Sequence, residues 1–181
     1  MMNQVQQFLD IANVEQNQTS IDLYRDLLRE ETCEFWTAWA KRDRVEMLDG
    51  IADVMFVNVA LYHLDWHLNG GAPENYHNVG DAFDSLIKAA GFSEHQAHEA
   101  MDIVCASNLS KFDDNERDAH TTALKYMHLG IDTNQRKCMT TGKYATFSAH
   151  DQLGSDCKTY QRGKLLKSAV NYFKPDFSEI L

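Results

Sequence analysis

Acidic side chains at helical spacing are the residues of this sequence best suited to chemistry. The segment Glu30-Glu31-Thr32-Cys33-Glu34 lies in a stretch whose apolar residues recur at helical intervals: Leu23, Tyr24, Leu27, Leu28, Phe35 and Ala38. At about 100° per residue, Glu31 and Glu34 project into the middle of this apolar stripe, and Glu30 lies at its edge. An ionised carboxylate is costly to bury unless it is paired or binds a metal. This segment therefore predicts a bound cation.

A second acidic set lies on the next predicted helix. Residues 51–64 are apolar almost all round, as expected for a helix at the centre of a bundle, and Asp53 lies among them. Glu46, Asp49 and Asp53 fall on one side of this helix, about one per turn. Oxygen ligands without a nearby His or Cys favour Mg²⁺, or Mn²⁺, over zinc or copper. Because Mg²⁺ completes its octahedron with substrate phosphates, the two helices predict a nucleotide polyphosphate site.

Helical periodicity dominates the chain up to about residue 130, and only two prolines interrupt its 181 residues. Thr19 or Ser20 is the expected cap of the second helix, Ser93 and Gln96 form a capping box, and Gly130 closes the sixth helix in a left-handed conformation. The run Asn69-Gly70-Gly71 followed by Pro73 ends the third helix. We expect helices over about 5–12, 19–41, 44–67, 81–90, 93–108 and 117–129.

The pattern changes beyond Gly130. Residues 143–148 and 160–168, separated by Asp151, Gly154 and Ser155, are typical of a hairpin or an irregular strap. The predicted fold is therefore all-α, a helical bundle with a short irregular or hairpin C-terminal strap. We expect a helical catalytic domain over 1–135 and a basic strap over 136–181 that packs on the same domain.

Composition excludes several classes of function. The formal net charge of −10 argues against binding a nucleic-acid polymer, because that affinity depends on Lys and Arg. The N-terminal segment lacks the features of a secretion signal, and no run of about 18 apolar residues predicts a membrane span. The four cysteines form no C-x-x-C pair, which favours reduced thiols and a cytoplasmic location. Basic residues crowd the last quarter of the chain, where they could hold a small polyphosphate: Arg136, Lys137, Lys143, Lys158, Arg162, Lys164, Lys167 and Lys174.

Taken together, these motifs resemble those of the all-α NTP pyrophosphohydrolase superfamily, the MazG-like proteins, which include phosphoribosyl-ATP pyrophosphohydrolases and dimeric dUTPases. The family pattern is E-E-x-x-E on one helix and E-x-x-D on the next. Residues 30–34 match the first half, and 48–57 resemble the second. The segment Ser107-Asn108-Leu109-Ser110-Lys111 and the stretches 163–167 and 171–176 resemble those of small bacterial and phage-type members. The resemblance covers about residues 5–176.

The chain departs from the family pattern at Gly50, where E-x-x-D ending at Asp53 requires Glu. Asp49 can replace that Glu, and Glu46-x-x-Asp49 is a second literal match. The predicted metal ligands are Glu31, Glu34, Asp49 and Asp53, with Glu30 and Glu46 as alternative or outer ligands.

The resemblance implies hydrolysis of a nucleoside triphosphate or deoxynucleoside triphosphate to the monophosphate and pyrophosphate. Carboxylate-held Mg²⁺ would activate the attacking water, and Glu31 or Glu34 would orient or deprotonate it. Asn108, Lys111, Lys164 and Lys167 would contact the substrate, with the lysines as phosphate-binding point charges. Family members assemble through helix packing, so a homodimer or homotetramer is expected, with Phe35, Trp36 and Trp39 as additional apolar surface.

Other interpretations remain open from the sequence. The acids could lie on solvated faces or pair with nearby bases: Arg25, Arg29, Lys41, Arg42 and Arg44. A di-iron bundle would need Glu-x-x-His on two helices, whereas the chain has one such motif, Glu74 to His77. His63 and His67 are spaced as half of a zinc site, but no Glu follows the first His. A helical nucleotide-binding or interaction module without catalysis is the alternative of a different class.

Overall fold

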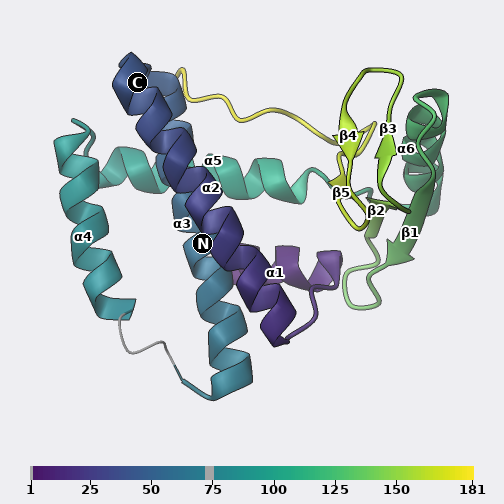
Figure 1. Cartoon of the computed structure of the whole chain (residues 1–181), viewed down its shortest axis with the longest axis horizontal. Coiled ribbons are helices and arrows are strands. Elements are labelled where there is room, and N and C mark those ends of the chain that lie inside the picture. Colours follow the sequence, from purple (N-terminus) through teal and green to yellow (C-terminus); the bar gives the residue numbers. More distant parts are fainter. Residues whose placement is uncertain (1, 72–75) are drawn as a thin grey trace. The chain divides into compact units, whose positions relative to one another are not determined.

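The computed structural model describes residues 2–71 and 76–181, and it describes the side chains of 2–71 and 83–181. Six helices precede five short strands within this part of the chain (Figure 1). The helices are α1 (Met2–Ala12), α2 (Gln18–Lys41), α3 (Arg44–Asn69), α4 (Tyr76–Ala89), α5 (Glu94–Leu109) and α6 (Glu116–His128). The strands are β1 (Thr133–Lys137), β2 (Tyr144–Ser148), β3 (Gln152–Leu153), β4 (Thr159–Tyr160) and β5 (Leu165–Leu166).

The chain forms two compact units. Unit 1 comprises Met1–Gln6, Val14–Ala106 and Pro175–Leu181, and unit 2 comprises Gln7–Asn13 and Ser107–Lys174. Unit 1 thus holds α2, α3 and α4, and unit 2 holds α6 and all five strands. The expected division into a catalytic domain over 1–135 and a strap over 136–181 is a division by function, and it stays a prediction.

The helices of unit 1 begin and end where side chains or left-handed residues satisfy their terminal groups. Asn17, not Thr19 or Ser20, caps α2, because its side chain accepts a hydrogen bond from the Ser20 backbone N–H at 2.9 Å. The predicted capping box before α5 is confirmed: the Ser93 N–H donates to Gln96 Oε1, and the Gln96 N–H donates to Ser93 Oγ. Gly70 ends α3 in the left-handed conformation. Pro73 and Glu74 lie outside the described residues, so the predicted stop at Pro73 and the Glu-x-x-His motif are not described.

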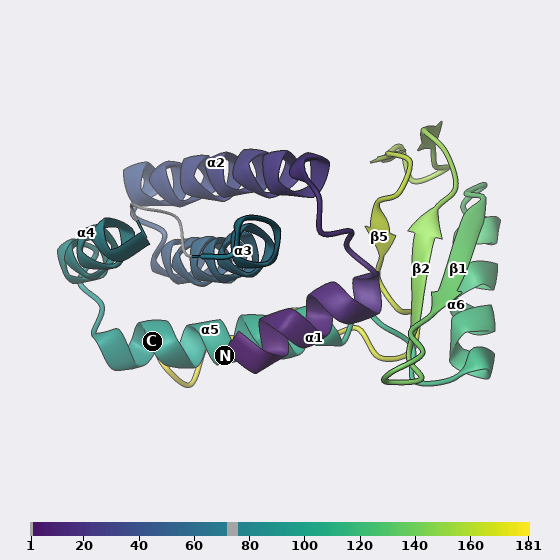
Figure 2. The same cartoon turned by 90° about the horizontal axis from the view of Figure 1, so that it is seen from below.

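Helix α3 lies between α2 and α5 in unit 1 (Figure 2). Ten of its residues are buried, which confirms that this apolar segment is the central helix of unit 1. Buried side chains such as Leu48, Ile51 and Leu64 come from different turns of the helix and fill the space toward its neighbours.

Unit 2 combines one helix with two small antiparallel sheets. The three-stranded sheet has the order β1-β2-β5, and β3 pairs with β4. The Gln135 side chain of β1 donates hydrogen bonds to the Ala119 carbonyl of α6 and to Thr146 Oγ1, so α6 covers this face of the sheet. A buried apolar cluster joins α6 to the strands and to the segment between them: Tyr126, Ile131, Tyr160 and Leu166.

The predicted all-α fold is wrong, because the C-terminal region is a β-structure of five strands. The strand predicted over 143–148 is confirmed as β2, but the second half of the expected hairpin, 160–168, contains only the ends of two short strands. Strand β1 was missed because all five of its residues are polar and four are exposed, so no apolar alternation marks it. The strands β3, β4 and β5 span two residues each, too few for any periodic signal.

Candidate functional site

The predicted acidic residues of α2 and α3 lie on a pair of antiparallel helices. Arg42, in the left-handed conformation, ends α2, and the next residue, Asp43, caps α3 by accepting a hydrogen bond from the Glu46 N–H. So short a turn folds the first half of α3 back along the second half of α2. The two halves carry the acids at similar distances from the turn: Glu30, Glu31 and Glu34 on α2, and Asp49 and Asp53 on α3.

The two helices are in close contact beside these acids, at Phe35 and Gly50. A Cβ atom added to Gly50 would lie 3.0 Å from both the Cα and the Cβ of Phe35. Any side chain at position 50 would therefore meet the α2 backbone. A side chain at this position would require the two helices to shift, and the acids of α3 flank it at Asp49 and Asp53.

Glu31 is the acid most affected by its surroundings. Its pKa is raised from 4.5 to about 8, first by burial and then by repulsion from Asp53, Glu34, Glu30 and Asp49, in that order. All three predicted partners in the metal set therefore act on Glu31, and so does Glu30. Glu46 is not among these charges. Four negative side chains next to a half-buried carboxylate form an environment that a cation would stabilise.

The acids differ in exposure. Glu31, Asp49 and Asp53 are half-buried. The Oδ1 atom of Asp49 is shielded from solvent. Glu34, predicted to face the core together with Glu31, is exposed, and so are Glu30 and Glu46. The reason is geometric: three residues of α-helix leave Glu34 about 60° from Glu31, at the edge of the buried stripe. Leu23, expected on the same stripe, is also exposed.

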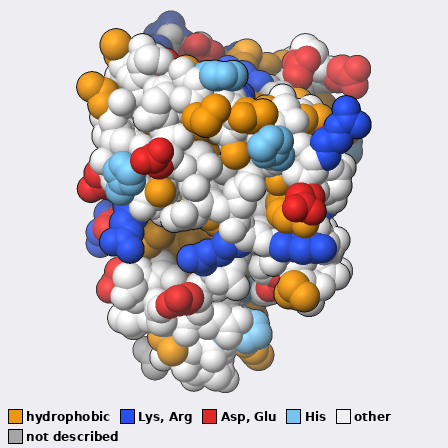
Figure 3. Space-filling view, turned by 90° about the vertical axis from the view of Figure 1, so that its right-hand side faces the viewer, with side chains coloured by type: hydrophobic (Ala, Val, Ile, Leu, Met, Phe, Trp, Pro, Cys, Tyr) orange, Lys and Arg blue, Asp and Glu red, His pale blue; other side chains and the backbone are white. Residues whose placement is uncertain are grey.

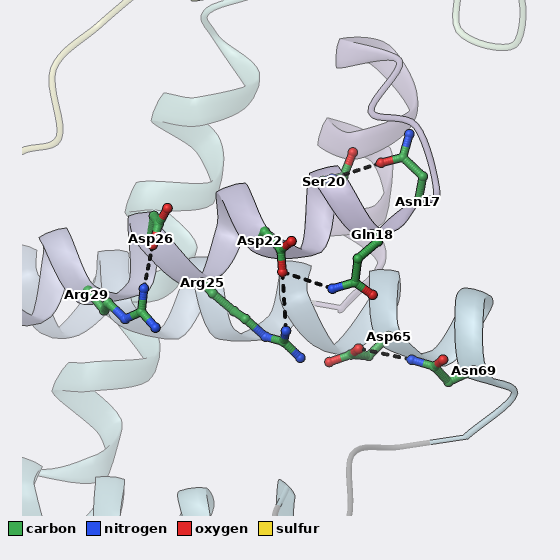
Figure 4. A network of polar contacts seen from close by, with 9 residues as sticks. All are labelled: Asn17, Gln18, Ser20, Asp22, Arg25, Asp26, Arg29, Asp65 and Asn69. Atoms are coloured by element: carbon green, nitrogen blue, oxygen red, sulfur yellow. Dashed lines mark hydrogen bonds and ion pairs between the residues drawn. The ribbon is translucent and has the colours of Figure 1, made fainter.

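Arg25 and Arg29, the arginines nearest the candidate acids of α2, form ion pairs with other residues. Arg25 pairs with Asp22 at 3.4 Å and Arg29 with Asp26 at 2.5 Å, both on the surface of α2 (Figure 4). The guanidinium of Arg44 lies over the ring of Phe92. Within the described residues, no Lys, Arg or His side chain forms an ion pair with Glu30, Glu31 or Glu34. The alternative in which these acids are neutralised by neighbouring bases therefore finds no support for the acids of α2.

The carboxylate oxygens of these acids are suitable ligands for a hard divalent cation, but they do not form a complete coordination site. All are carboxylate oxygens, the ligands that Mg²⁺ and Mn²⁺ prefer. Among the side chains of 2–71 and 83–181, however, no three His, Cys, Asp or Glu residues are grouped closely enough to hold a metal ion. The assignment of Glu31, Glu34, Asp49 and Asp53 as ligands, with Glu30 and Glu46 as alternatives, stays a prediction.

The predicted substrate-binding residues Asn108 and Lys111 lie in unit 2, not in the unit that carries the acids. The Lys111 ammonium donates to Asn108 Oδ1 at 2.5 Å, and Asn108 is buried. The two serines of the same segment hold the C-terminal chain: Ser107 Oγ donates to the Phe173 carbonyl, and the Phe173 N–H donates to Ser110 Oγ. The serines of the S-N-x-S-K segment thus have a structural role in unit 2.

Lys164 and Lys167 are exposed residues of unit 2. The Lys167 ammonium donates to the Tyr172 hydroxyl at 2.8 Å, and its backbone contacts the Tyr126 hydroxyl. Lysine and arginine side chains are spread among acids and apolar groups on the face seen from the side of α6 and β1 (Figure 3). Unit 2 holds 11 of the 17 Lys and Arg residues but only 8 of the 27 Asp and Glu residues, so the negative charge is concentrated in unit 1.

The sequence did not identify Asp113 as a distinctive residue. Its carboxylate is buried in unit 2, where Oδ1 accepts hydrogen bonds from Thr122 Oγ1 and Ser168 Oγ. In the sequence, Asp113 belongs to the polar run Asp113-Asp114-Asn115-Glu116, and nothing in that run separates the buried residue from its exposed neighbours.

Comparison with protein-family models, with curated proteins and with solved structures found no match to this chain. The resemblance to MazG-like pyrophosphohydrolases therefore rests on the sequence motifs alone. Within the part of the chain that the structure describes, none of the helices combines the length and the apolar composition required to cross a lipid bilayer.

Proposed function

We propose that this protein is a Mg²⁺-dependent nucleoside triphosphate pyrophosphohydrolase, which converts an NTP or dNTP and water to the monophosphate and pyrophosphate. The observation that carries the proposal is the environment of Glu31, a half-buried carboxylate whose pKa is raised by the charges of four other acids from two helices. A purely structural carboxylate would be expected to have a base or several hydrogen-bond donors beside it. Repulsion of this kind is tolerated where a cation binds.

The acids of α2 and α3 would have two roles, metal binding and orientation of the attacking water. Glu31, Glu34, Asp49 and Asp53 would hold Mg²⁺, or Mn²⁺, which when bound lowers the pKa of water and offsets charge on phosphate oxygens. Glu31 has a pKa near 8 in the cation-free chain, so it can hold a proton at neutral pH and release it when a cation binds. Exposed Glu34 can reach a water molecule and orient it or accept its proton.

The proposed roles of Asn108, Lys111, Lys164 and Lys167 concern the substrate phosphates. Lysine ammonium groups bind phosphate as point charges, and unit 2 is the part of the chain where positive charge exceeds negative. Variants of these residues test the roles directly: Lys111→Met or Lys164→Met would raise KM more than they lower kcat.

The decisive experiment measures pyrophosphate and orthophosphate released from a panel of NTPs, dNTPs, dUTP and phosphoribosyl-ATP, with Mg²⁺ and with EDTA. We expect metal-dependent pyrophosphate release from at least one substrate, and loss of about 100-fold or more in kcat for Glu34→Gln. Asp22→Asn is the matched control, because Asp22 is an exposed acid of the same helix whose side chain contacts Gln18 and Arg25. A folded native chain that cleaves no substrate would contradict the proposal and favour a binding module without catalysis.

Two further proposals concern the state of the protein. A homodimer or homotetramer is supported by large apolar side chains left in solvent on α2, where Leu23 is 55% and Trp36 is 50% exposed. Light scattering during size-exclusion chromatography would detect it, and a monomer at micromolar concentration would contradict it. A cytoplasmic location is supported by the four cysteines, all of which are free thiols.

A further inference from the structure

We propose that the buried carboxyl group of Asp113 is a pH-sensitive latch for residues 168–171, the chain segment that follows β5. The latch holds this segment against α6 when the carboxyl group carries a proton, and loosens it when the group is ionised. The device lies within unit 2, so it depends neither on the acids of α2 and α3 nor on nucleotide hydrolysis.

Two hydroxyl groups connect the segment to Asp113. Ser168 Oγ and Thr122 Oγ1 both donate to the same carboxyl oxygen, Oδ1. Ser168 Oγ also accepts hydrogen bonds from two backbone N–H groups of the segment, and Thr122 Oγ1 accepts one from a third. The hydrogen bonds that dock the segment on α6 therefore converge on one oxygen of Asp113.

The other oxygen of this carboxyl group indicates which charge state the docked segment favours. Asp113 is 1% exposed, and its Oδ2 atom has no hydrogen-bond partner among the described residues. A charged oxygen is costly to bury without a donor, and a neutral hydroxyl costs less. A proton on Oδ2 removes the charge and leaves both hydroxyl groups bound to Oδ1. The geometry therefore favours the protonated form while the segment is docked.

The electrostatic surroundings of Asp113 act in the same direction. Burial is the largest influence and raises the pKa of Asp113 above its ordinary value of 3.8. Hydrogen bonds from Ser168 and Thr122 lower the pKa, and the charges of Asp118 on α6 and Asp114 in the adjoining chain raise it. The outcome is a raised pKa, so the docked state binds the proton more tightly than an exposed carboxyl group does.

No base offsets a charge on Asp113. Within the part of the chain whose side chains are described, no Lys, Arg or His forms an ion pair with this carboxylate. The other titratable groups close to the network contact different partners: Lys111 contacts Asn108, Lys143 contacts Asp114, Lys167 contacts Tyr172, and the Tyr126 hydroxyl contacts the Lys167 backbone.

The sign of the pH dependence follows from these contacts. When the segment is released, Asp113 meets water and its pKa returns toward 3.8. Docking is therefore strongest below this value and weakens as the pH rises through the raised pKa of the docked state. Each pH unit between the two pKa values changes the docking equilibrium by about tenfold.

The test is hydrogen exchange at the three amides of the segment, those of Ala169, Val170 and Asn171, followed by NMR between about pH 4 and pH 8. Protection factors correct for the intrinsic effect of pH on exchange. Native protein is compared with Asp113→Asn, which keeps an acceptor for both hydroxyl groups but cannot ionise. Asp114→Asn is the matched control, because Asp114 is an exposed neighbour in the sequence that pairs with Lys143.

We expect protection of the three amides to fall by about tenfold over this range in native protein and in Asp114→Asn, and to change by less than about twofold in Asp113→Asn. The carboxyl carbon shift of Asp113 in native protein should titrate with the same midpoint, which tests the latch even if Asp113→Asn does not fold. Protection that is independent of pH in native protein, or an equal decline in Asp113→Asn, would overturn the proposal. Neither result bears on pyrophosphate release, which is assayed separately.

Discussion

Glu31 of unit 1 and Asp113 of unit 2 are both shielded carboxyl groups with raised pKa values, and burial is the largest cause for each. Their neighbours differ in kind. Around Glu31 the neighbours that act on it are four more acids, all of which raise its pKa further. Around Asp113, hydrogen bonds from Ser168 and Thr122 lower the pKa, and the charges of Asp118 and Asp114, which raise it, are smaller contributions.

The hydroxyl groups that donate to Asp113 also accept hydrogen bonds from backbone N–H groups. Thr122 Oγ1 accepts from the Ala169 N–H, and Ser168 Oγ accepts from the Val170 and Asn171 N–H groups. Asp113 thus fixes the chain after β5 to α6 and has a structural role. Among the described residues, Glu31 has no comparable set of donors, which supports the proposed cation site, whereas Asp113 is part of the framework of unit 2.

The largest expected effect is on stability in unit 2. Asp113→Ala leaves the hydroxyl groups of Thr122 and Ser168 without their buried acceptor, and should lower the free energy of unfolding by about 3 kcal/mol. Urea unfolding followed by circular dichroism measures it. Asp114→Ala is the control, because Asp114 is exposed and forms a surface ion pair with Lys143. Loss of this pair should lower the free energy of unfolding by less than about 1 kcal/mol. Equal effects of the two substitutions would remove the contrast drawn above.

For Glu31 we expect the opposite effect, an increase in the free energy of unfolding when the carboxylate is removed. In EDTA at pH 9, Glu31→Gln removes an ionised group from a negative environment and should raise the free energy of unfolding by about 1–2 kcal/mol, a value reduced by solvent screening. The same variant should lose pyrophosphate release. Glu46→Gln, an exposed acid that does not act on Glu31, should leave stability nearly unchanged. Destabilisation by Glu31→Gln would show that Glu31 is structural, like Asp113.

The stability of the cation-free chain should depend on pH through Glu31. Its pKa is higher in the folded chain than the ordinary 4.5, so the folded state binds the proton more tightly. Its contribution to stability therefore falls as pH rises from 4.5 to about 8 and is lost above that. The native Tm should decline from pH 6 to pH 9 more than the Tm of Glu31→Gln, as measured by scanning calorimetry. Mg²⁺ should reverse the decline, because it favours the ionised form; identical profiles for the two proteins would refute the assignment.

The smallest expected effect is a difference in Mn²⁺ affinity that distinguishes the two candidate ligands on α3, Asp49 and Glu46. Asp49 is among the main charges that raise the pKa of Glu31 and Glu46 is not, so Asp49→Asn should weaken Mn²⁺ binding by about tenfold and Glu46→Gln by less than about twofold. Titration calorimetry on both variants gives the answer. The reverse order would place Glu46 in the metal set and move the site toward the start of α3.

Most helix positions were predictable because their signals are local and repeated; the start of α4 was not, since α4 begins at Tyr76 and the expected helix began at about 81. The period of apolar residues located α2 and α3 to within about two residues, and the Ser93 capping box located the start of α5. The sheet was not predictable from the same signals. Its strands are short, and β1 consists of polar residues that are held by pairing with β2 and by Gln135, contacts between residues distant in the sequence.

Helical spacing predicts which acids share a face, and the grouping of Glu31, Glu34, Asp49 and Asp53 around one ion stays a prediction. Their exposure was less predictable: the periodic pattern placed Glu34 with Glu31 in the core, but the edge of a stripe depends on what packs against it. The close contact of Gly50 with Phe35 could not be predicted from the sequence, because a departure from a motif does not reveal that a neighbouring backbone occupies the space.

The order of synthesis gives the Asp113 network a further consequence. Ser168 follows Asp113 by 55 residues, and Phe173 follows Ser107 by 66, whereas Phe35 and Gly50 are joined within one helical hairpin. At about 5–20 residues per second, roughly 3–11 seconds separate translation of Asp113 from translation of its partner Ser168. The α2–α3 hairpin can pair early on the ribosome. During that time the apolar side chains of Phe112 and Tyr126 in unit 2 stay exposed to solvent, because their later partners are not yet synthesised. That interval is when a nascent chain of this protein would most need a chaperone.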